Sequence, residues 1–277
     1  MSQAVLPGAT VASLQRQSLL DPVDNRILLC HALGLSRMGL ITQSERALTN
    51  DEATHLAALI ARRLAGEPVA YIIGRREFYG LDFAVDANVL IPRPETELLV
   101  ELALERLPPR GRVLDMGTGS GAIAVALAHA RPDAAVTALD VSAGALAVAA
   151  RNAAANGATV RFLQSDWFGA LTDESFDLIV SNPPYIASGD RHLSEGDLRF
   201  EPAGALTDHA DGLSALRRIV GGAPAHLVPG SWLLMEHGYD QSEAVQALLT
   251  AAGWQDVQSW HDLAGIARVT GGRAALR

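Results

Sequence analysis

The chain has 277 residues, of which 49% are hydrophobic and 19% charged, enough for one large domain or two ordinary ones with a buried core. Its formal net charge of -9 disfavours a general nucleic-acid binder, because an acidic surface repels phosphate backbones. The single cysteine, Cys30, excludes an internal disulfide and favours a reducing compartment. The first residues carry neither a basic start nor a continuous apolar run, and no window reaches the roughly 18 apolar residues of a membrane span, so we expect a cytoplasmic protein without membrane contact.

Residues 1–74 are predicted to form a small all-helical domain. One helix is expected after Asp21, a good N-cap residue, with Pro22 in the first helical position. A second helix is expected to begin at Thr49 and to end at Gly66. Its predicted apolar stripe consists of Leu56, Leu59, Ile60 and Leu64.

A short connecting segment is predicted over residues 75–94. It contains two extended pieces, REFYGLDFAV and NVLIPRP, whose alternation indicates a β-hairpin or a connecting ribbon. The stretch ETELLVELALERL then opens with acidic residues, which suit a helix N-terminus. We therefore expect a hairpin linker between two domains, the second of which covers residues 95–277.

From residue 112 onward, short apolar strands alternate with helical stretches. The predicted strands cover residues 112–117, 134–140, 159–166, 176–182, 230–238, 254–260 and 266–272. This alternation predicts an α/β fold, in which helices cover both faces of a parallel sheet. Only a loop separates the last two strands, which indicates an antiparallel pair at one edge.

The stretch LDMGTGSGA (residues 114–122) lies where the first of these strands turns into a helix. Glycines at positions 117, 119 and 121 allow a tight turn and let a ligand approach the backbone closely. In an open α/β sheet, ligands bind at the carboxyl ends of the strands. A tight structural turn that binds no ligand is the alternative interpretation.

Two cofactors fit this loop. The spacing Gly117-x-Gly119-x-x-Ala122, with Asp140 about 20 residues further on, satisfies a relaxed dinucleotide fingerprint. S-adenosylmethionine uses the same geometry, with Asp115 facing its ammonium group and Asp140 accepting the ribose hydroxyls. An unpaired carboxylate beside a pyrophosphate is unfavourable, so Asp115 favours S-adenosylmethionine.

The next two strand ends carry polar and aromatic side chains. After the third strand, Asp166 and Trp167 can flank an adenine, although Trp167 can equally be a core aromatic. The fourth strand leads into SNPPY, in which Asn182 and the carbonyl of Pro183 can accept the two N–H groups of an amide or aromatic amine. Tyr185 can stack on that flat group, and the prolines fix the backbone. Such an arrangement aims an unreactive nitrogen at a methyl group by orientation; a Pro-stiffened turn is the alternative.

These motifs, in this order and spacing, resemble the HemK/PrmC family of glutamine methyltransferases over nearly the whole chain. IPRPETE before the strands and RFEPAGAL after NPPY separate this family from nucleic-acid amino-methyltransferases. The resemblance implies a seven-stranded Rossmann-like S-adenosylmethionine-dependent methyltransferase domain, joined to the helical domain by the hairpin. It also implies methylation of the glutamine side-chain amide in the Gly-Gly-Gln motif of bacterial peptide chain release factors, with S-adenosylhomocysteine as the product.

The resemblance also assigns roles to residues. It implies cofactor contacts for Gly117, Thr118, Gly119, Ser120, Gly121, Asp140, Trp167 and Asn182. It implies contacts to the target glutamine for Asn182, Pro183, Pro184 and Tyr185. The helical domain is expected to grip the release factor, and the protein to act as a monomer without a metal or direct nucleic-acid contact. Arg93 and Glu97 are expected to shape the site, with a structural loop salt bridge as the alternative, and Ala267 stands where relatives usually carry an acidic or amide residue.

Two other functions compete with this interpretation. An adenine or cytosine amino-methyltransferase acting on nucleic acid shares NPPY, but it needs a base-flipping pocket and a basic track. The acidic chain offers only the short basic stretches at 61–63 and 74–77. A nucleotide-sensing regulatory domain would use the glycine loop but would leave residues 182–185 without a purpose. A protein-glutamine methyltransferase is therefore the function we expect.

Overall fold

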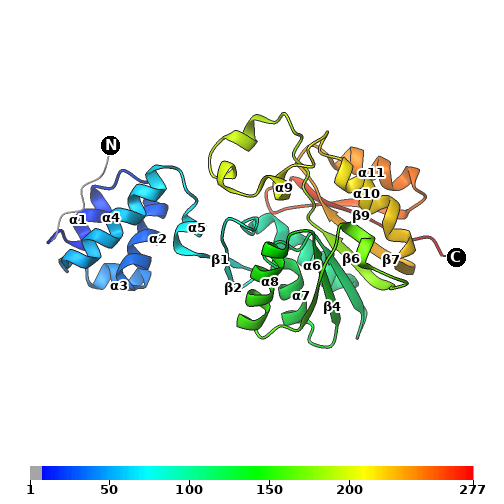
Figure 1. Cartoon of the computed structure of the whole chain (residues 1–277), viewed down its shortest axis with the longest axis horizontal. Helices are drawn as coiled ribbons and strands as arrows, with labels where there is room; N and C mark the ends of the chain where they lie inside the picture. Colours follow the sequence, from blue (N-terminus) through cyan, green and yellow to red (C-terminus); the bar gives the residue numbers. More distant parts are fainter. Residues whose placement is uncertain (1–7, 277) are drawn as a thin grey trace. The chain divides into compact units, whose positions relative to one another are not determined.

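The computed structural model describes residues 8–276, and the chain divides after Gly74 into two compact units, 1–74 and 75–277 (Figure 1). Each unit has buried hydrophobic clusters of its own. No helix in the described part is both long enough and apolar enough to cross a membrane.

The first unit is helical, as predicted. Its described helices are α1 (Val11–Arg16), α2 (Pro22–Leu33), α3 (Arg37–Thr42), α4 (Asn50–Leu64) and α5 (Val69–Ile73). The Asp21 side chain accepts a hydrogen bond from the N–H of Val23 at 2.8 Å, and Thr49 forms a capping box with Glu52. Both predicted helix starts are therefore correct. Leu64 departs from the predicted apolar stripe: it lies in the last turn of α4 and is 40% exposed, while the other three members are buried.

The second unit opens with a β-hairpin. β1 (Arg75–Phe78) and β2 (Leu81–Ala84) pair antiparallel around Tyr79 and Gly80, whose φ angles are both positive at 51° and 75°. The predicted hairpin is confirmed, but both of its strands come from the first extended piece. The second piece, NVLIPRP, forms no strand, because two of its last three residues are prolines, which cannot donate to a ladder.

A seven-stranded sheet forms the centre of the second unit, as predicted. Its strands are β3 (Arg112–Met116), β4 (Ala135–Asp140), β5 (Val160–Gln164), β6 (Phe176–Ser181), β7 (Leu227–Glu236), β8 (Gln255–His261) and β9 (Ala267–Arg273). The order is β5-β4-β3-β6-β7-β9-β8, with β9 antiparallel to both neighbours and the other pairs parallel. Because the chain runs outward from β3 in one direction and returns beside it at β6, the carboxyl ends of β3 and β6 form the switch point where such sheets bind ligands.

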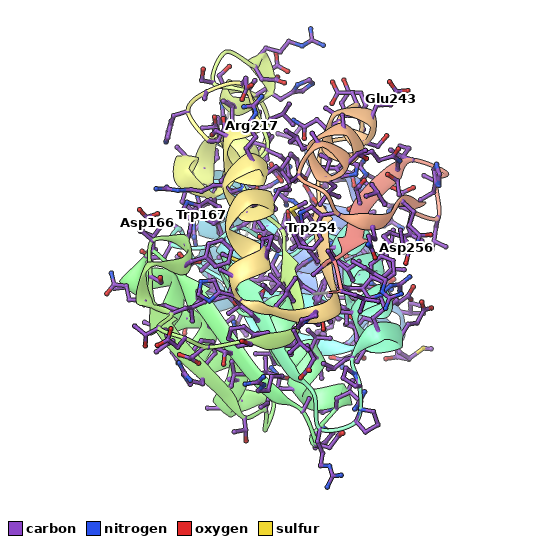
Figure 2. All side chains as sticks on the ribbon, turned by 90° about the vertical axis from the view of Figure 1, so that its right-hand side faces the viewer. Asp166, Trp167, Arg217, Glu243, Trp254 and Asp256 are labelled. Carbon is purple, nitrogen blue, oxygen red and sulfur yellow. The ribbon has the colours of Figure 1, made fainter. Side chains whose placement is uncertain are left out.

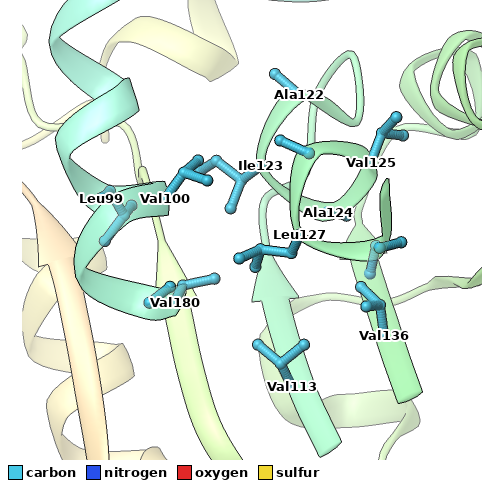
Figure 3. Packing of buried hydrophobic residues seen from close by; sticks show 14 of the residues in the cluster. Leu99, Val100, Val113, Ala122, Ile123, Ala124, Val125, Leu127, Val136 and Val180 are labelled. Carbon is cyan, nitrogen blue, oxygen red and sulfur yellow. The ribbon is translucent and has the colours of Figure 1, made fainter. Parts of the chain in front are cut away.

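Helices cover both faces of this sheet. The described helices of the unit are α6 (Glu97–Arg106), α7 (Ala122–Ala130), α8 (Ala143–Ala155), α9 (Ala203–Leu206), α10 (Ser214–Gly222) and α11 (Ser242–Ala251), with 3-10 turns η1 (Pro94–Thr96), η2 (Trp167–Ala170), η3 (Arg191–Ser194), η4 (Leu198–Phe200) and η5 (Ala223–Ala225). Val113 and Leu114 of β3 point to opposite faces: the first joins the cluster with α6 and α7, the second the cluster with α10 and α11. Figure 3 shows Ile123 and Leu127 of α7 packed beside Val100 of α6. Leu127 is fully buried, which stabilises the fold by roughly 1.5–3 kcal/mol.

Candidate active site

A cavity of about 240 Å³ lies at the carboxyl ends of β3, β4 and β6, at the switch point of the sheet. Its lining includes Gly117, Gly119, Asp140, Asp166, Trp167, Asn182 and Pro184, all of which the sequence analysis singled out. Thr118, Ser120, Gly121, Pro183 and Tyr185 are next to these residues in the chain but do not line the cavity. The structure thus brings the glycine loop, the end of β4, the SDWF turn and NPPY to one place.

The glycine loop follows β3 with positive φ angles at Gly117 (73°) and Gly119 (53°). The N–H of Gly117 donates to the carbonyl of Leu139 at 2.9 Å, which holds the loop against β4. Gly121 (φ 83°) precedes α7, and a Cβ there would lie 3.0 Å from Cβ of Ala149 in α8. The close packing of α7 against α8 therefore requires glycine at this position.

Asp140, the last residue of β4, is held by backbone N–H groups. Its Oδ2 accepts from Gly119 at 2.9 Å, and its Oδ1 accepts from Ser142 at 2.9 Å. Burial raises the pKa of Asp140, and the N–H groups of Ser142 and Gly119 oppose that shift. Each carboxylate oxygen keeps a second lone pair, so Asp140 can also accept two hydroxyl groups from the cavity, as a ribose presents them.

Asp115 does not line the cavity, in contrast to the expected contact with a ligand ammonium group. Its side chain is fully buried, and its Oδ2 accepts from the hydroxyl of Thr118 at 2.6 Å. Oδ1 is buried with no hydrogen-bond partner among the described residues. Burial raises the pKa of Asp115 to about 7, with a smaller contribution from the charge of Asp140. In this structure Asp115 supports the glycine loop through Thr118.

The SDWF turn places Asp166 and Trp167 in the cavity wall, and Figure 2 shows them together at the start of η2. Trp167 has a positive φ of 52°, a conformation that costs a non-glycine residue of order 1–3 kcal/mol. Ser165 stabilises the turn, because its Oγ donates to the carbonyl of Trp167 at 2.7 Å and accepts from the N–H of Ala170 at 2.9 Å. Trp167 also packs against the hydrophobic cluster of α10, so the two interpretations of this residue are compatible.

NPPY begins directly after β6. Ser181 ends the strand and donates from Oγ to the carbonyl of Met116 at 2.7 Å, which fixes β6 against the end of β3. Asn182 and Pro184 line the cavity, and Nδ2 of Asn182 donates to Oγ1 of Thr96 at 3.2 Å. With its nitrogen turned toward Thr96, Asn182 can accept a hydrogen bond through its amide oxygen.

Tyr185 follows Pro184 in the chain but is not part of the cavity lining. Its hydroxyl is 3.4 Å from Oε1 of Glu236, and burial raises the pKa of Tyr185. Its backbone carbonyl accepts from Nε2 of Gln241 at 3.0 Å. The tyrosine is therefore held at both ends, and stacking of its ring on a substrate stays a prediction.

Two segments line the cavity that the sequence analysis did not place there: residues 88–90, and the residues Pro202, Gly204 and Ala205. Just beyond these segments, a salt bridge joins Arg93 to the buried carboxylate of Glu201, and Oε2 of Glu201 also accepts from the N–H of Ile91 at 3.0 Å. Both segments belong to the family stretches NVLIPRP and RFEPAGAL, but neither has the period of a strand or a long helix. Only their resemblance to family motifs could have indicated that they line the cavity. Arg93 forms the loop salt bridge that the sequence analysis gave as the alternative to a role in shaping the site.

Two other residues noted in the sequence lie away from the cavity lining. Glu97 accepts from the N–H of Tyr79 at 2.9 Å and so fixes the hairpin turn. Ala267 opens β9 and pairs with His261 of β8. Among residues 8–276, no group of three or more His, Cys, Asp or Glu side chains is arranged to hold a metal ion.

Comparisons with known proteins agree with this geometry. Residues 94–201 match the Methyltransferase small domain family, and residues 11–74 match the PrmC N-terminal domain family. The release factor glutamine methyltransferase of Burkholderia pseudomallei is 57% identical over 274 residues, 96% of each chain. That of Salmonella typhimurium is 50% identical over 252 residues, 90% of this chain and 91% of its own. A methyltransferase structure from Pyrococcus furiosus, 20% identical, shares the fold with a TM-score of 0.55 over 78% of this chain and 98% of its own.

The sheet order, the glycine loop and the acidic residue that ends β4 define an S-adenosylmethionine-dependent methyltransferase. The cavity fits that cofactor, because Asp140 has free lone pairs, Gly117 exposes its backbone and Trp167 offers a flat ring. With 57% identity over nearly the full length, the chain belongs to the family of release factor glutamine methyltransferases, which are S-adenosylmethionine-dependent protein-glutamine methyltransferases. The family, the fold and the cofactor expected from the sequence are confirmed.

Proposed function

We propose that the chain methylates the side-chain amide of the glutamine in the Gly-Gly-Gln motif of bacterial peptide chain release factors, and that residues 182–185 hold that glutamine. The observation that carries the proposal is the position of Asn182, which lies at the end of β6 in the wall of the same cavity as Gly117 and Asp140. The names of the curated relatives from Burkholderia pseudomallei and Salmonella typhimurium support the choice of substrate.

The reaction requires an amide nitrogen to attack a methyl group as a nucleophile. Its lone pair is delocalised into the carbonyl group, so the nitrogen is a poor nucleophile. Oδ1 of Asn182 and the backbone carbonyl of Pro183 accept its two N–H groups and turn the nitrogen toward the methyl group. When bound, S-adenosylmethionine supplies that methyl group as an electrophile and leaves as S-adenosylhomocysteine. The nitrogen then sheds a proton to water, so residues 182–185 need no strong base among them.

The cofactor contacts follow the sequence assignment. Gly117 to Gly121 provide the loop, with Gly117 and Gly119 in the cavity wall and Thr118, Ser120 and Gly121 shaping the turn. Asp140 binds the ribose hydroxyls, Trp167 packs on the adenine, and Asn182 contacts both cofactor and substrate. These roles are supported by the cavity lining and by the free lone pairs of Asp140.

The first unit is assigned to gripping the release factor. Its match to the PrmC N-terminal domain family supports this, as do two exposed apolar side chains of α3, Met38 (65% exposed) and Ile41 (67% exposed). We place the protein in the cytoplasm, where translation termination takes place. We also propose that it acts as a monomer without direct nucleic-acid contact. The net charge of -9 supports the last of these statements.

A labelling experiment tests the proposal. The purified protein is incubated with methyl-labelled S-adenosylmethionine and, in parallel, a release factor, the same factor with the Gly-Gly-Gln glutamine changed to alanine, DNA and RNA. We expect label on the unchanged factor alone. Label on DNA, or label that persists on the glutamine-to-alanine factor, contradicts the proposed substrate.

A further inference from the structure

A buried carboxylate lies behind NPPY. Glu236 ends β7, the neighbour of β6 in the sheet, and it is only 2% exposed. Its Oε1 is 3.4 Å from the hydroxyl of Tyr185, and its Oε2 is buried without a hydrogen-bond partner among the described residues. Burying a carboxylate in this way costs free energy, and the proposed mechanism gives Glu236 no contact with substrate or cofactor. The hydrogen bonds around it indicate what it does.

Thr96 connects Glu236 to Asn182. Thr96 is buried at the N-cap position of α6, where a threonine ordinarily caps the helix with its hydroxyl, yet it makes no capping hydrogen bond. Its Oγ1 instead accepts from Nδ2 of Asn182 at 3.2 Å. Burial raises the pKa of Glu236 to about 7, and hydrogen bonds from Thr96 and Tyr185 act in the opposite direction. The threonine hydroxyl therefore does not cap the helix; it accepts from Asn182, and its interaction with Glu236 lowers the pKa of that carboxyl.

The chemistry of these three groups decides which of them can donate and which can accept. An ionised carboxylate is only an acceptor, whereas a hydroxyl has a single hydrogen to donate. If Thr96 gives its hydrogen to Glu236, its oxygen can only accept from Asn182. The amide of Asn182 then turns its nitrogen toward Thr96 and its oxygen away, although the reversed amide would have the same shape.

We propose that Glu236 is a positioning residue for methyl transfer, which acts through Thr96 to hold Oδ1 of Asn182 toward the substrate nitrogen and through the hydroxyl of Tyr185 to hold that ring. Glu236 itself touches neither substrate nor cofactor. The inference rests on the proposed function, because it takes Asn182 as the acceptor for the glutamine amide. With the carboxylate replaced by a group that also donates, Asn182 loses its preference between the two amide orientations.

Three variants test the connection from Glu236 through Thr96 to Asn182, which is called the relay below. Glu236→Gln keeps the shape but adds a donor, and Thr96→Val keeps the shape but removes the hydroxyl. Both are expected to lower kcat on the release factor about tenfold or more, the scale of one misdirected hydrogen bond, while the Kd for S-adenosylmethionine stays unchanged. Thr96→Ser restores the hydroxyl and is expected to recover most of the turnover. A folded Glu236→Gln protein with wild-type kcat overturns the proposal, as does a Thr96→Val protein no worse than Thr96→Ser.

A second readout separates this proposal from the proposed substrate. The side-chain amide of Asn182 is followed by ¹⁵N NMR in the full-length protein with S-adenosylhomocysteine. We expect its Nδ2 signal to shift in Glu236→Gln and in Thr96→Val but not in Thr96→Ser. A signal that is the same in all four proteins refutes the relay whatever the enzyme methylates. Conversely, absence of transfer to the release factor by the wild type, together with the expected shifts, refutes the substrate and leaves the relay standing.

Discussion

Asp140 and Asn182 line one cavity, but their surroundings suit them to different halves of the reaction. Asp140 is an acceptor held by the N–H groups of Gly119 and Ser142, whereas Asn182 is an amide held through its nitrogen by Thr96. We expect Asp140→Ala to weaken S-adenosylmethionine binding at least tenfold, since hydrogen bonds to a charged group contribute about 1.5–3 kcal/mol.

Asn182→Ala is the matching substitution, and we expect it to leave cofactor binding almost intact while turnover falls by about 10²–10³, the loss seen when an oriented polar group at a reacting centre is removed. Titration calorimetry with S-adenosylmethionine and single-turnover labelling of the release factor measure the two effects separately. Near-full turnover by Asn182→Ala would rule out its orienting role.

If Glu236 orients Asn182 as proposed, its ionisation should give the reaction a pH dependence. Arg268 of β9 lowers its pKa and Glu95 of η1 raises it, but burial dominates and brings the pKa to about 7. As the pH falls below about 7, the carboxyl takes up a proton and becomes a donor, so the orientation of Asn182 is lost. We expect kcat to fall from pH 8 to pH 6 in the wild type and to stay low and flat in Glu236→Gln. Because the pKa of Asp115 is also raised to about 7, cofactor affinity is measured at each pH, and a kcat profile that follows affinity assigns the effect to Asp115.

At the scale of elements, the strands and helices between residues 112 and 181 could be predicted because each has a regular apolar period and a clear end. The glycine loop, Asp140 and Asn182 could be placed with them, since parallel strands bring their carboxyl ends together. NVLIPRP and the segment from 187 to 213 could not be placed. Their positions depend on contacts far apart in sequence, such as Arg93 with Glu201, which no local pattern encodes. A role for Glu236 could not be predicted for the same reason, because its partners come from other parts of the chain.

The pairing of Arg93 with Glu201 supplies an element-scale prediction, because it joins the chain just beyond two segments of the cavity wall. The Glu201 side chain is completely buried, so removing its partner leaves an uncompensated charge, which typically costs about 3–5 kcal/mol. We expect Arg93→Met to lower the free energy of unfolding by roughly that amount and to raise the Kd for S-adenosylmethionine. The double variant Arg93→Met/Glu201→Gln should regain much of the stability, since the buried charge is gone. Urea unfolding measures the free energy of unfolding of each variant, and titration calorimetry measures the Kd for S-adenosylmethionine. Equal stabilities of the single and double variants would show that the pair is not coupled.

At the scale of the whole molecule, the chain consists of two units with separate hydrophobic cores, and the cavity is built entirely from residues of the second. The proposed role in partner recognition would account for the exposed apolar residues on α3. The sequence alone did not single out Met38 or Ile41, because α3 is only six residues long and shows no period.

If the first unit grips the release factor, substitutions in α3 must weaken binding of the intact release factor and leave the methyl transfer itself unchanged. We expect Met38→Glu combined with Ile41→Glu to raise the KM for an intact release factor about tenfold or more, as burying two charges at an interface would. The same protein should methylate a short Gly-Gly-Gln peptide as the wild type does, because the peptide is too small to need a second contact. Val23→Glu is the control, since Val23 is also exposed but lies on α2. An unchanged KM for the intact factor would move the docking surface away from α3, whereas parallel losses on factor and peptide would point to damage in the catalytic unit.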